Sequence, residues 1–223
     1  MSWSKRGRGH HRRGYHHGDL SEALVRAALS LIDDYGPAGF TFAEVARAVG
    51  VSPAAPYRHF RDRDALMAEV ARRGFERFAD ALSRAWNDGA PDPFTAFMSM
   101  GRAYLTFARA EPAYYAAMFE AGLPPDASPE LSRAGDAAFA VVRRAAETLI
   151  ATLPKDSRPP ALMMSLHVWA LSHGIASLFA RGDAARRKVP MPPEDLLEAG
   201  VLVYLQGLGI DRGHALDRRG GNG

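Results

Sequence analysis

The feature that most constrains the fold of this chain is the spacing of its apolar residues, which recur every three or four positions along most of its length. This spacing places apolar side chains on one face of an α-helix and polar ones on the other. Glycine and proline interrupt the pattern at intervals, and no segment alternates apolar and polar residues as a half-buried strand does. The sequence therefore predicts an all-α fold made of several separate helices.

The interruptions predict where the helices begin and end. Asp19 stands at the N-cap position of the first helix, which ends at Gly36. A long helix starts at Asp62 or Asp64 and lasts until the turn at residues 87–89. Beyond that turn we expect helices at residues 94–110, 113–119, 129–153, 161–181 and 193–208.

Residues 41–60, TFAEVARAVGVSPAAPYRHF, have the layout of two short helices joined by a tight turn. Thr41 and Glu44 have the spacing of a capping box at the start of the first helix. Gly50 can adopt the left-handed conformation of the turn, and Ser52 caps a second helix that ends near residue 60. A second helix presented in this way can lie in the major groove of DNA.

The composition, with 47% hydrophobic and 24% charged residues and no cysteine, is typical of a soluble globular protein. The absence of cysteine excludes thiol nucleophiles, disulfides and cysteine-based zinc sites. Phosphate-binding glycine loops and the H-E-x-x-H and G-x-S-x-G motifs are also absent, so we expect no enzyme, no cofactor and no metal. We find no signal peptide and no run of about 18 uncharged apolar residues, which predicts a cytoplasmic protein without a membrane span.

Positive charge is concentrated at the start of the chain. Residues 1–63 hold 10 Lys and Arg against 6 Asp and Glu, whereas the remainder holds 18 against 19. We expect residues 1–18 to form a flexible basic arm that follows phosphates or reaches into a minor groove. An expression remnant, a solubilising tail or a metal site at its four histidines are the alternatives, although adjacent His pairs do not favour metal. Residues 210–223 are expected to be a disordered tail.

The segment from Asp19 to Phe78 resembles, in the order and spacing of its motifs, the DNA-binding domain of the tetracycline-repressor (TetR) family of bacterial regulators. The matching motifs are the capped first helix, F-T-F-A-E-V-A, G-V-S, Y-R-H-F and the A-L pair at 65 and 66. The resemblance implies a DNA-binding domain at residues 19–78 and a ligand-binding and dimerisation domain at residues 79–209. It also implies phosphate contacts from Thr41, Tyr57, His59 and Arg63, and a recognition surface at or beside Ser52, Ala54, Ala55 and Arg58.

Two positions depart from the family pattern. Arg63 stands where lysine is usual, which keeps the charge and changes the geometry. Pro56 removes a backbone donor inside the second short helix and crowds the carbonyl of Ser52, so that helix starts late or is bent. Ala54, Ala55 and Pro56 cannot hydrogen-bond to base edges through their side chains, which leaves readout to Ser52, Tyr57 and Arg58 or to apolar contact with thymine methyl groups.

Each of these assignments has a simpler alternative. Tyr57 and Phe60 can fill the core of the domain, and Arg58 and Arg63 can belong to a solvated face.

The resemblance also implies a homodimer in which the last two helices of each subunit form a four-helix bundle. Ala170, Gly174 and Ser177 recur at helical spacing and form a strip on which another helix can pack closely. We expect the facing side chains to be Leu196, Leu197, Val201, Tyr204 and Leu205.

Aromatic and methionine residues are numerous in the middle of the chain, and a ligand-binding domain would use some of them to line a large apolar cavity. Trp169 and His173 lie in a string that resembles the W-x-x-x-H-G signature of one TetR subgroup. They can face a ligand, or they can be a core tryptophan and an internally bonded histidine. The candidate ligand contacts are Phe97, Tyr104, Phe107, Tyr114, Tyr115, Met118, Trp169 and His173.

Together these features predict a transcription regulator, more often a repressor, that binds a palindromic operator in double-stranded DNA. A small apolar or aromatic molecule would release it by favouring a different spacing of the two recognition elements. The alternative is a DNA-bound scaffold of the same fold that acts through a protein partner, which an exposed apolar patch outside the dimer contact would favour.

Overall fold

The computed structural model describes residues 17–124, 126–179 and 190–210. These residues form α-helices, short 3₁₀ helices and turns, with no strand among them, which confirms the all-α class. The predicted basic arm and the predicted tail lie almost entirely outside the described residues.

The first helix, α1, covers His17–Tyr35 and starts earlier than expected. Asp19 therefore lies inside the first turn, and its predicted position as the N-cap is wrong. Several polar residues precede the apolar stripe here, and local pattern fixes a helix start only to within one or two residues.

The short helix α2, Phe42–Val49, forms as predicted. Thr41 Oγ1 accepts a hydrogen bond from the Glu44 N–H at 3.3 Å, and the Thr41 N–H donates to Glu44 Oε2 at 2.7 Å. Gly50 ends the helix with φ of 75°, a left-handed conformation that a side chain would strain. The capping box and the glycine turn are thus both confirmed.

The second short α-helix is not formed. Residues 53–55 make a turn, and a single 3₁₀ turn, Pro56–Arg58, follows it. Pro56 is the physical reason, because it lacks the N–H that would bond to Ser52, and the Ala55 N–H takes that carbonyl at 3.0 Å instead. The expected late or bent start is therefore realised as a turn followed by a tighter helix.

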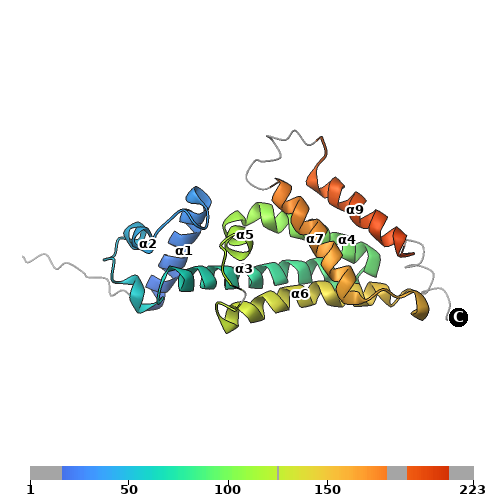
Figure 1. The fold of residues 1–223 in the computed structure, drawn as a ribbon, viewed down its shortest axis with the longest axis horizontal. Coiled ribbons are helices and arrows are strands. Elements are labelled where there is room, and N and C mark those ends of the chain that lie inside the picture. The colour runs from blue at the N-terminus through green and yellow to red at the C-terminus, as the bar shows by residue number, and fades with distance from the viewer. Residues whose placement is uncertain (1–16, 125, 180–189, 211–223) are drawn as a thin grey trace, which may run out of the picture.

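The long helix α3, Arg63–Trp86, organises the rest of the molecule. Asp62 caps it by accepting the Ala65 N–H at 2.8 Å. Figure 1 shows α3 running along the long axis, with α1 and α2 near one end. The helices α4 (Pro93–Ala110), α5 (Pro112–Phe119) and α6 (Pro129–Ile150) pack against α3. Because α3 continues to Trp86, the predicted domain boundary after residue 78 falls inside this helix.

The remaining helices, α7 (Ala161–Phe179) and α9 (Pro193–Gly207), lie at the other end (Figure 1). By length and mean hydropathy, 1.3, α7 alone among the described helices resembles a membrane-crossing helix, although serine and histidine residues interrupt its apolar run. In the structure α7 packs against α4, α6 and α9 as one helix of the bundle. Only about a third of its apolar stretch is buried within the chain.

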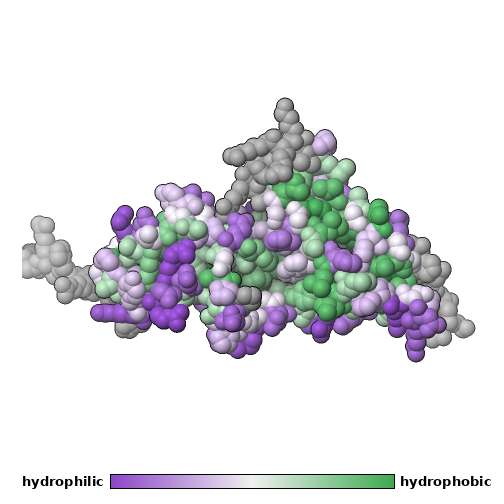
Figure 2. Space-filling model, in the orientation of Figure 1, coloured by the Kyte–Doolittle hydropathy of each residue, from purple (hydrophilic) through white to green (hydrophobic). Residues whose placement is uncertain are grey.

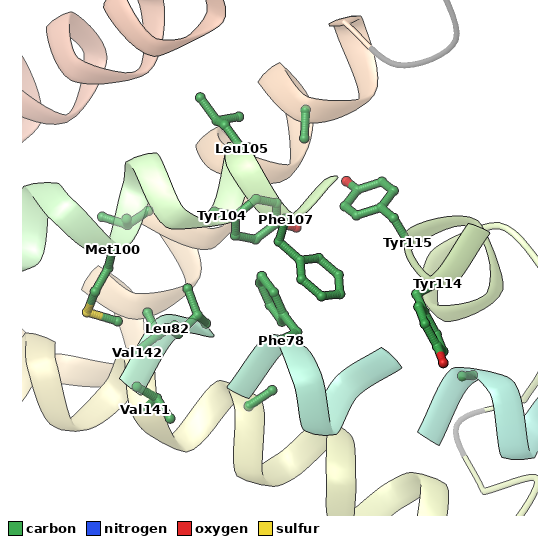
Figure 3. Packing of buried hydrophobic residues seen from close by; sticks show 14 of the residues in the cluster. Phe78, Leu82, Met100, Tyr104, Leu105, Phe107, Tyr114, Tyr115, Val141 and Val142 are labelled. Atoms are coloured by element: carbon green, nitrogen blue, oxygen red, sulfur yellow. The ribbon is translucent and has the colours of Figure 1, made fainter. Parts of the chain in front are cut away.

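One apolar core runs from α1 to α9 and has Phe78 of α3 near its centre. Phe78 is fully buried, and its ring lies 4.9 Å from the ring of Tyr104 and 5.0 Å from that of Phe107, both on α4. Figure 3 shows these rings meeting between the two helices. About one turn earlier on α3, a Cβ at Gly74 would lie 2.8 Å from Met118 Sδ, so α5 approaches α3 closely there.

Arg63, the first residue of α3, fastens the loop between α1 and α2. Its Nε donates to the Phe40 carbonyl at 3.0 Å, another guanidinium nitrogen donates to the Pro37 carbonyl, and the group lies 4.8 Å from the centre of the Phe40 ring. The side chain is 26% exposed, so most of it is used within the protein rather than presented to DNA.

We therefore expect Arg63→Lys to lower the free energy of unfolding by about 1 kcal/mol, because an ammonium group cannot span both carbonyls and stack on the ring. Thermal or urea unfolding without DNA measures this loss. Arg61→Lys is the matched control, since that side chain is 85% exposed and its replacement should change stability little. Equal stability of the Arg63 variant and the original protein would contradict the assignment.

Candidate DNA-binding surface and ligand pocket

Residues 51–60 form the candidate reading segment, which is held firmly on α2. The Val51 N–H donates to the Ala46 carbonyl at 3.0 Å. The ring of Tyr57 meets the ring of Phe42 edge to face, with 5.0 Å between centroids. Tyr57 is nevertheless 60% exposed, so the alternative that it fills the core is wrong, whereas Phe60 is half-buried and packs against the core.

Most of the predicted DNA contacts lie within residues 51–60, but only some of the whole set are exposed. Thr41 is also engaged locally, because its hydroxyl donates to Glu44 Oε2 at 2.8 Å, and Arg63 is turned toward the loop carbonyls. Ala55 and His59 are half-buried. The exposed members of the set are Thr41, Ser52, Ala54, Tyr57 and Arg58.

Two further arginines, which sequence reasoning missed, lie near this stretch. Arg47 is exposed on α2, and Arg61 is exposed just before α3, where it pairs with Asp62 at 2.8 Å. Their position inside or directly after residues 41–60 was the available signal, because a basic residue beside a reading element can contact a phosphate.

The predicted large cavity bounded by the aromatic residues is not present in the described part of the chain. Phe97, Tyr104 and Trp169 surround a void of only about 20 Å³. Trp169 packs edge to face against Phe78, and Met118 packs against Gly74. Side-chain volume explains the error, because helical spacing shows which side chains point inward but not whether they fill the space between helices.

A buried polar cluster lies at the edge of this packed core. The hydroxyls of Tyr104 and Tyr115 lie 3.0 Å and 2.9 Å from His173 Nδ1. The pKa of His173 is lowered by burial, partly offset by the negative charge of Glu120, while burial raises the pKa of both tyrosines. A neutral imidazole that accepts from a protonated phenol fits these shifts, and the histidine is internally bonded, as the alternative interpretation held.

A larger pocket, of about 380 Å³, opens beside the cluster between α4, α5, α7 and the start of α9. Of the predicted ligand contacts only Tyr115 lines it. Its other walls are mostly apolar, with Arg109 and Glu120 as charged members, and Arg109 pairs with Glu194 of α9 at 2.8 Å. The lining residues are Leu105, Ala108, Arg109, Pro112, Tyr115, Glu120, Ala176, Phe179 and Pro193.

A second hollow, of about 520 Å³, lies between α3, α4 and α5 and is predominantly charged. Phe107 and Tyr114, two of the predicted ligand contacts, line it beside Arg77. The Arg77 guanidinium lies 5.1 Å from the centre of the Tyr114 ring and 3.5 Å from Glu111 Oε1.

The predicted dimer residues separate into two groups. Ala170, Gly174 and Ser177 are exposed on α7, as a strip available to a second helix must be. Leu197 and Val201 are 3% and 4% exposed and face α4 inside the same chain, so their assignment to the dimer contact is wrong. α9 is apolar on several sides, and spacing alone could not show which side turns inward.

Tyr204 of α9 is half-buried and joins the outer surfaces of α7 and α9. Its hydroxyl lies 3.1 Å from His167 Nδ1, and the two rings meet edge to face.

Exposed large apolar side chains gather on these two helices. Outside α1 and the reading segment, the described examples are Leu162, Met163, Leu166 and Leu178 on α7, Val203 on α9, and Met191 just before α9. Figure 2 shows the hydrophobic surface over α7 and α9. No comparable patch lies elsewhere among the described residues, so nothing there favours the scaffold alternative.

Among the described residues, no group of three or more His, Asp or Glu side chains has the arrangement of a metal site. The four histidines of the predicted arm lie at positions 10, 11, 16 and 17, where the structure describes no side chains.

A short helix, a glycine turn and a reading segment at one end of a shared long helix, followed by a helical domain with a pocket, form the arrangement of a DNA-binding transcription regulator, with a 3₁₀ turn in place of the second helix. The model of the tetR family of bacterial regulatory proteins matches residues 24–70, and that of the tetracyclin repressor-like C-terminal domain matches residues 97–204. The chain belongs to the tetracycline-repressor (TetR) family of transcriptional regulators. Its assignment to the W-x-x-x-H-G subgroup stays a prediction.

Individual relatives agree with this membership. The HTH-type transcriptional regulator YobS of Bacillus subtilis is 26% identical over 87% of this chain and 95% of its own. A solved protein of unknown function from Rhodococcus sp. RHA1 is 32% identical, with a TM-score of 0.72 over 88% of this chain and 98% of its own. The TetR-family regulator PfmR of Thermus thermophilus, 17% identical with a TM-score of 0.62 over 79% and 93%, shares the fold.

The His173 cluster predicts a loss of stability in acid. As the pH falls through about 6.5, histidine in the unfolded chain takes up a proton that the half-buried ring of the folded protein resists, so the unfolded state is favoured. His173→Gln keeps a hydrogen-bonding side chain that does not titrate. Between pH 7.5 and pH 5.5 we expect the melting temperature of the original protein to fall further than that of the variant; parallel pH profiles would contradict a neutral His173.

Proposed function

We propose that the protein is a homodimeric repressor that binds a palindromic operator through residues 51–60 and is released by a small molecule bound in the 380 Å³ pocket. Membership of the TetR family supports DNA binding directly. The pocket supports release by a small molecule, because it is large enough for a small ligand and combines apolar walls with a few charged and hydroxyl groups.

The observation that carries this proposal is the continuity of α3. At its first residue, Arg63 holds the loop that precedes α2, and further along Phe78 packs against Tyr104, which belongs to the cluster beside the pocket. α5, whose Tyr115 forms part of the pocket wall, packs against both α3 and α1. A ligand that moves α4 or α5 therefore acts on the helices that position the reading segment.

The surface of α7 and α9 supports the dimer. Leu162 and Leu166 are 54% and 50% exposed, and Val203 is 70% exposed. Burying an exposed apolar surface of this kind against a partner stabilises the complex, because it removes apolar side chains from water. Two copies of the chain related by a twofold axis would bury the same surface on each copy. The same axis would present two reading segments to a palindrome, with half-sites about one helical turn, roughly 34–36 Å, apart.

The test of DNA recognition is selection of bound sequences from random double-stranded DNA by the purified protein. We expect an enriched palindrome whose half-sites lie one helical turn or a multiple of it apart. Uniform binding across sequences, or an enriched site without twofold symmetry, would overturn the proposal.

A substitution at Gly174 tests the dimer surface. A Cβ at this position meets no atom within 4 Å, so Gly174→Leu should leave the isolated chain folded while it separates two closely packed copies of α7. Sedimentation should show a shift toward monomer together with weaker operator binding. Gly135→Leu on α6 is the matched control, since a Cβ is equally unhindered there. A Gly174 variant that remains a dimer would exclude this strip from the contact.

The pocket is tested by narrowing it. Ala108 is half-buried and lines the pocket, so Ala108→Phe should reduce its volume with little effect on the reading segment. In a thermal-shift screen of small metabolites, a ligand should raise the melting temperature of the original protein by mass action and displace the operator. The variant should bind the operator normally and resist both effects; a ligand that acts equally on the two proteins binds elsewhere.

A further inference from the structure

We infer that the reading segment recognises thymine by its C5 methyl group, through an apolar edge formed by Pro53, Ala54 and Ala55. The inference rests on the proposed function, because it requires that residues 51–60 enter the major groove. It concerns which chemical group of the base is read, and which residues read it.

The part of the segment that leads into the 3₁₀ turn is apolar in its side chains. Pro53 and Ala54 are exposed and Ala55 is half-buried. In helix-turn-helix proteins the first residues of the reading element are those that meet base edges. Over these three positions the side chains offer hydrocarbon and no hydrogen-bonding group.

The backbone of the same stretch offers few donors to a base. Pro53 and Pro56 have no N–H. The Ala55 N–H already donates to the Ser52 carbonyl at 3.0 Å, and the Arg58 N–H donates to the Ala55 carbonyl at 3.2 Å. The surface that replaces the first turn of a recognition helix therefore presents apolar side chains and few backbone N–H donors.

The major groove contains one distinctly apolar group, the C5 methyl of thymine, and alanine is a side chain suited to contact it. Contact between the two methyl groups removes apolar surface from water without leaving a polar group unpaired. The two prolines fix their φ angles, so the edge is largely formed before DNA arrives and little conformational entropy is lost on binding.

Polar groups flank this edge and serve a different purpose. Tyr57 is exposed and oriented by its contact with Phe42, and Arg58 is exposed beside it. Contacts from such groups to phosphates set the position of the protein on DNA without identifying the base. Ser52 can hydrogen-bond to several bases and is therefore a weak discriminator.

A preference for A·T pairs could also arise from the shape of the groove, which depends on base sequence. The two explanations differ in their dependence on the methyl group. Replacing thymine with deoxyuracil removes that methyl and keeps every hydrogen-bonding group, and 5-methylcytosine restores the methyl on a different base pair.

The experiment uses the full chain and the operator obtained by selection from random DNA. Each thymine of one half-site is replaced in turn by deoxyuracil, and the equilibrium affinity is measured. Losing a contacted methyl should weaken binding about fourfold for each thymine, and on the order of fifteenfold when both half-sites carry the change. At the same position, 5-methylcytosine should bind about fourfold more tightly than cytosine.

Ala54→Gly identifies the residue responsible. Ala54 is exposed, so its replacement leaves the core unchanged. In this variant, replacing the contacted thymine with deoxyuracil should no longer weaken binding. The control is Ala127→Gly, at an exposed turn between α5 and α6, in which the same replacement should weaken binding as much as it does in the original protein.

The outcomes separate this inference from the proposed function. If selection yields no palindrome, the proposed function fails. If it yields a palindrome whose half-sites lack thymine, or whose affinity is unchanged by deoxyuracil, the methyl readout is overturned and sequence-specific DNA binding stands. A deoxyuracil penalty that persists in the Ala54 variant overturns the assignment of the methyl contact to Ala54.

Discussion

The burial of one face of α3 is the interaction on which the rest of the structure depends. Leu66, Val70, Phe78 and Leu82 lie on this helix and are at most 1% exposed, and they meet side chains from α1 at one end and from α4, α5 and α6 farther along. Burying a side chain of this size contributes about 1.5–3 kcal/mol, so the stripe is a major source of stability. Because one rigid helix supplies it, the DNA-binding unit and the helical domain share a core instead of meeting through a linker.

This shared core explains why the small N-terminal unit can hold an irregular reading segment. The backbone hydrogen bonds of the turn and the single 3₁₀ turn at residues 53–58 are all short-range and do not set the position of this stretch on α2. This stretch is fixed instead by neighbours: the Ala46 carbonyl, which accepts the Val51 N–H, and the Phe42 ring, which supports Tyr57. α2 in turn is held by its capping box, packs against α1, and follows the loop that Arg63 fastens to the start of α3.

Sequence reasoning succeeded where local chemistry decides the structure. The Thr41 capping box and the Gly50 turn depend on residues at most four positions apart, and both formed as predicted. Pro56 was identified as the position that disturbs the second helix, but whether the chain would bend or change helix type depends on its packing against α2. The family was also recognisable, because the order and spacing of its motifs lie in the sequence itself.

What sequence could not show depends on volume and on distant contacts. The aromatic residues were expected around a cavity, yet Phe97, Tyr104 and Trp169 fill their space, and the pocket opens where α4, α5 and α7 diverge. The Arg63 contacts join positions more than 20 residues apart. Leu197 and Val201 turn inward because α4 covers that side of α9.

The position of the pocket has a consequence for how a ligand could be sensed. A site enclosed within the aromatic core would have to expand close packing around Phe78, which interiors resist. The pocket lies beside that core and is joined to it through Tyr115, whose hydroxyl reaches His173 together with that of Tyr104. A ligand that bonds to Tyr115 would compete for this hydrogen bond and would press on α5 and the end of α7, elements whose Tyr115 and Ala176 line the pocket. Since α5 also packs against α1, such a movement would change the orientation of the reading segment relative to the axis of the proposed dimer, and only a ligand that favours the changed orientation would release DNA.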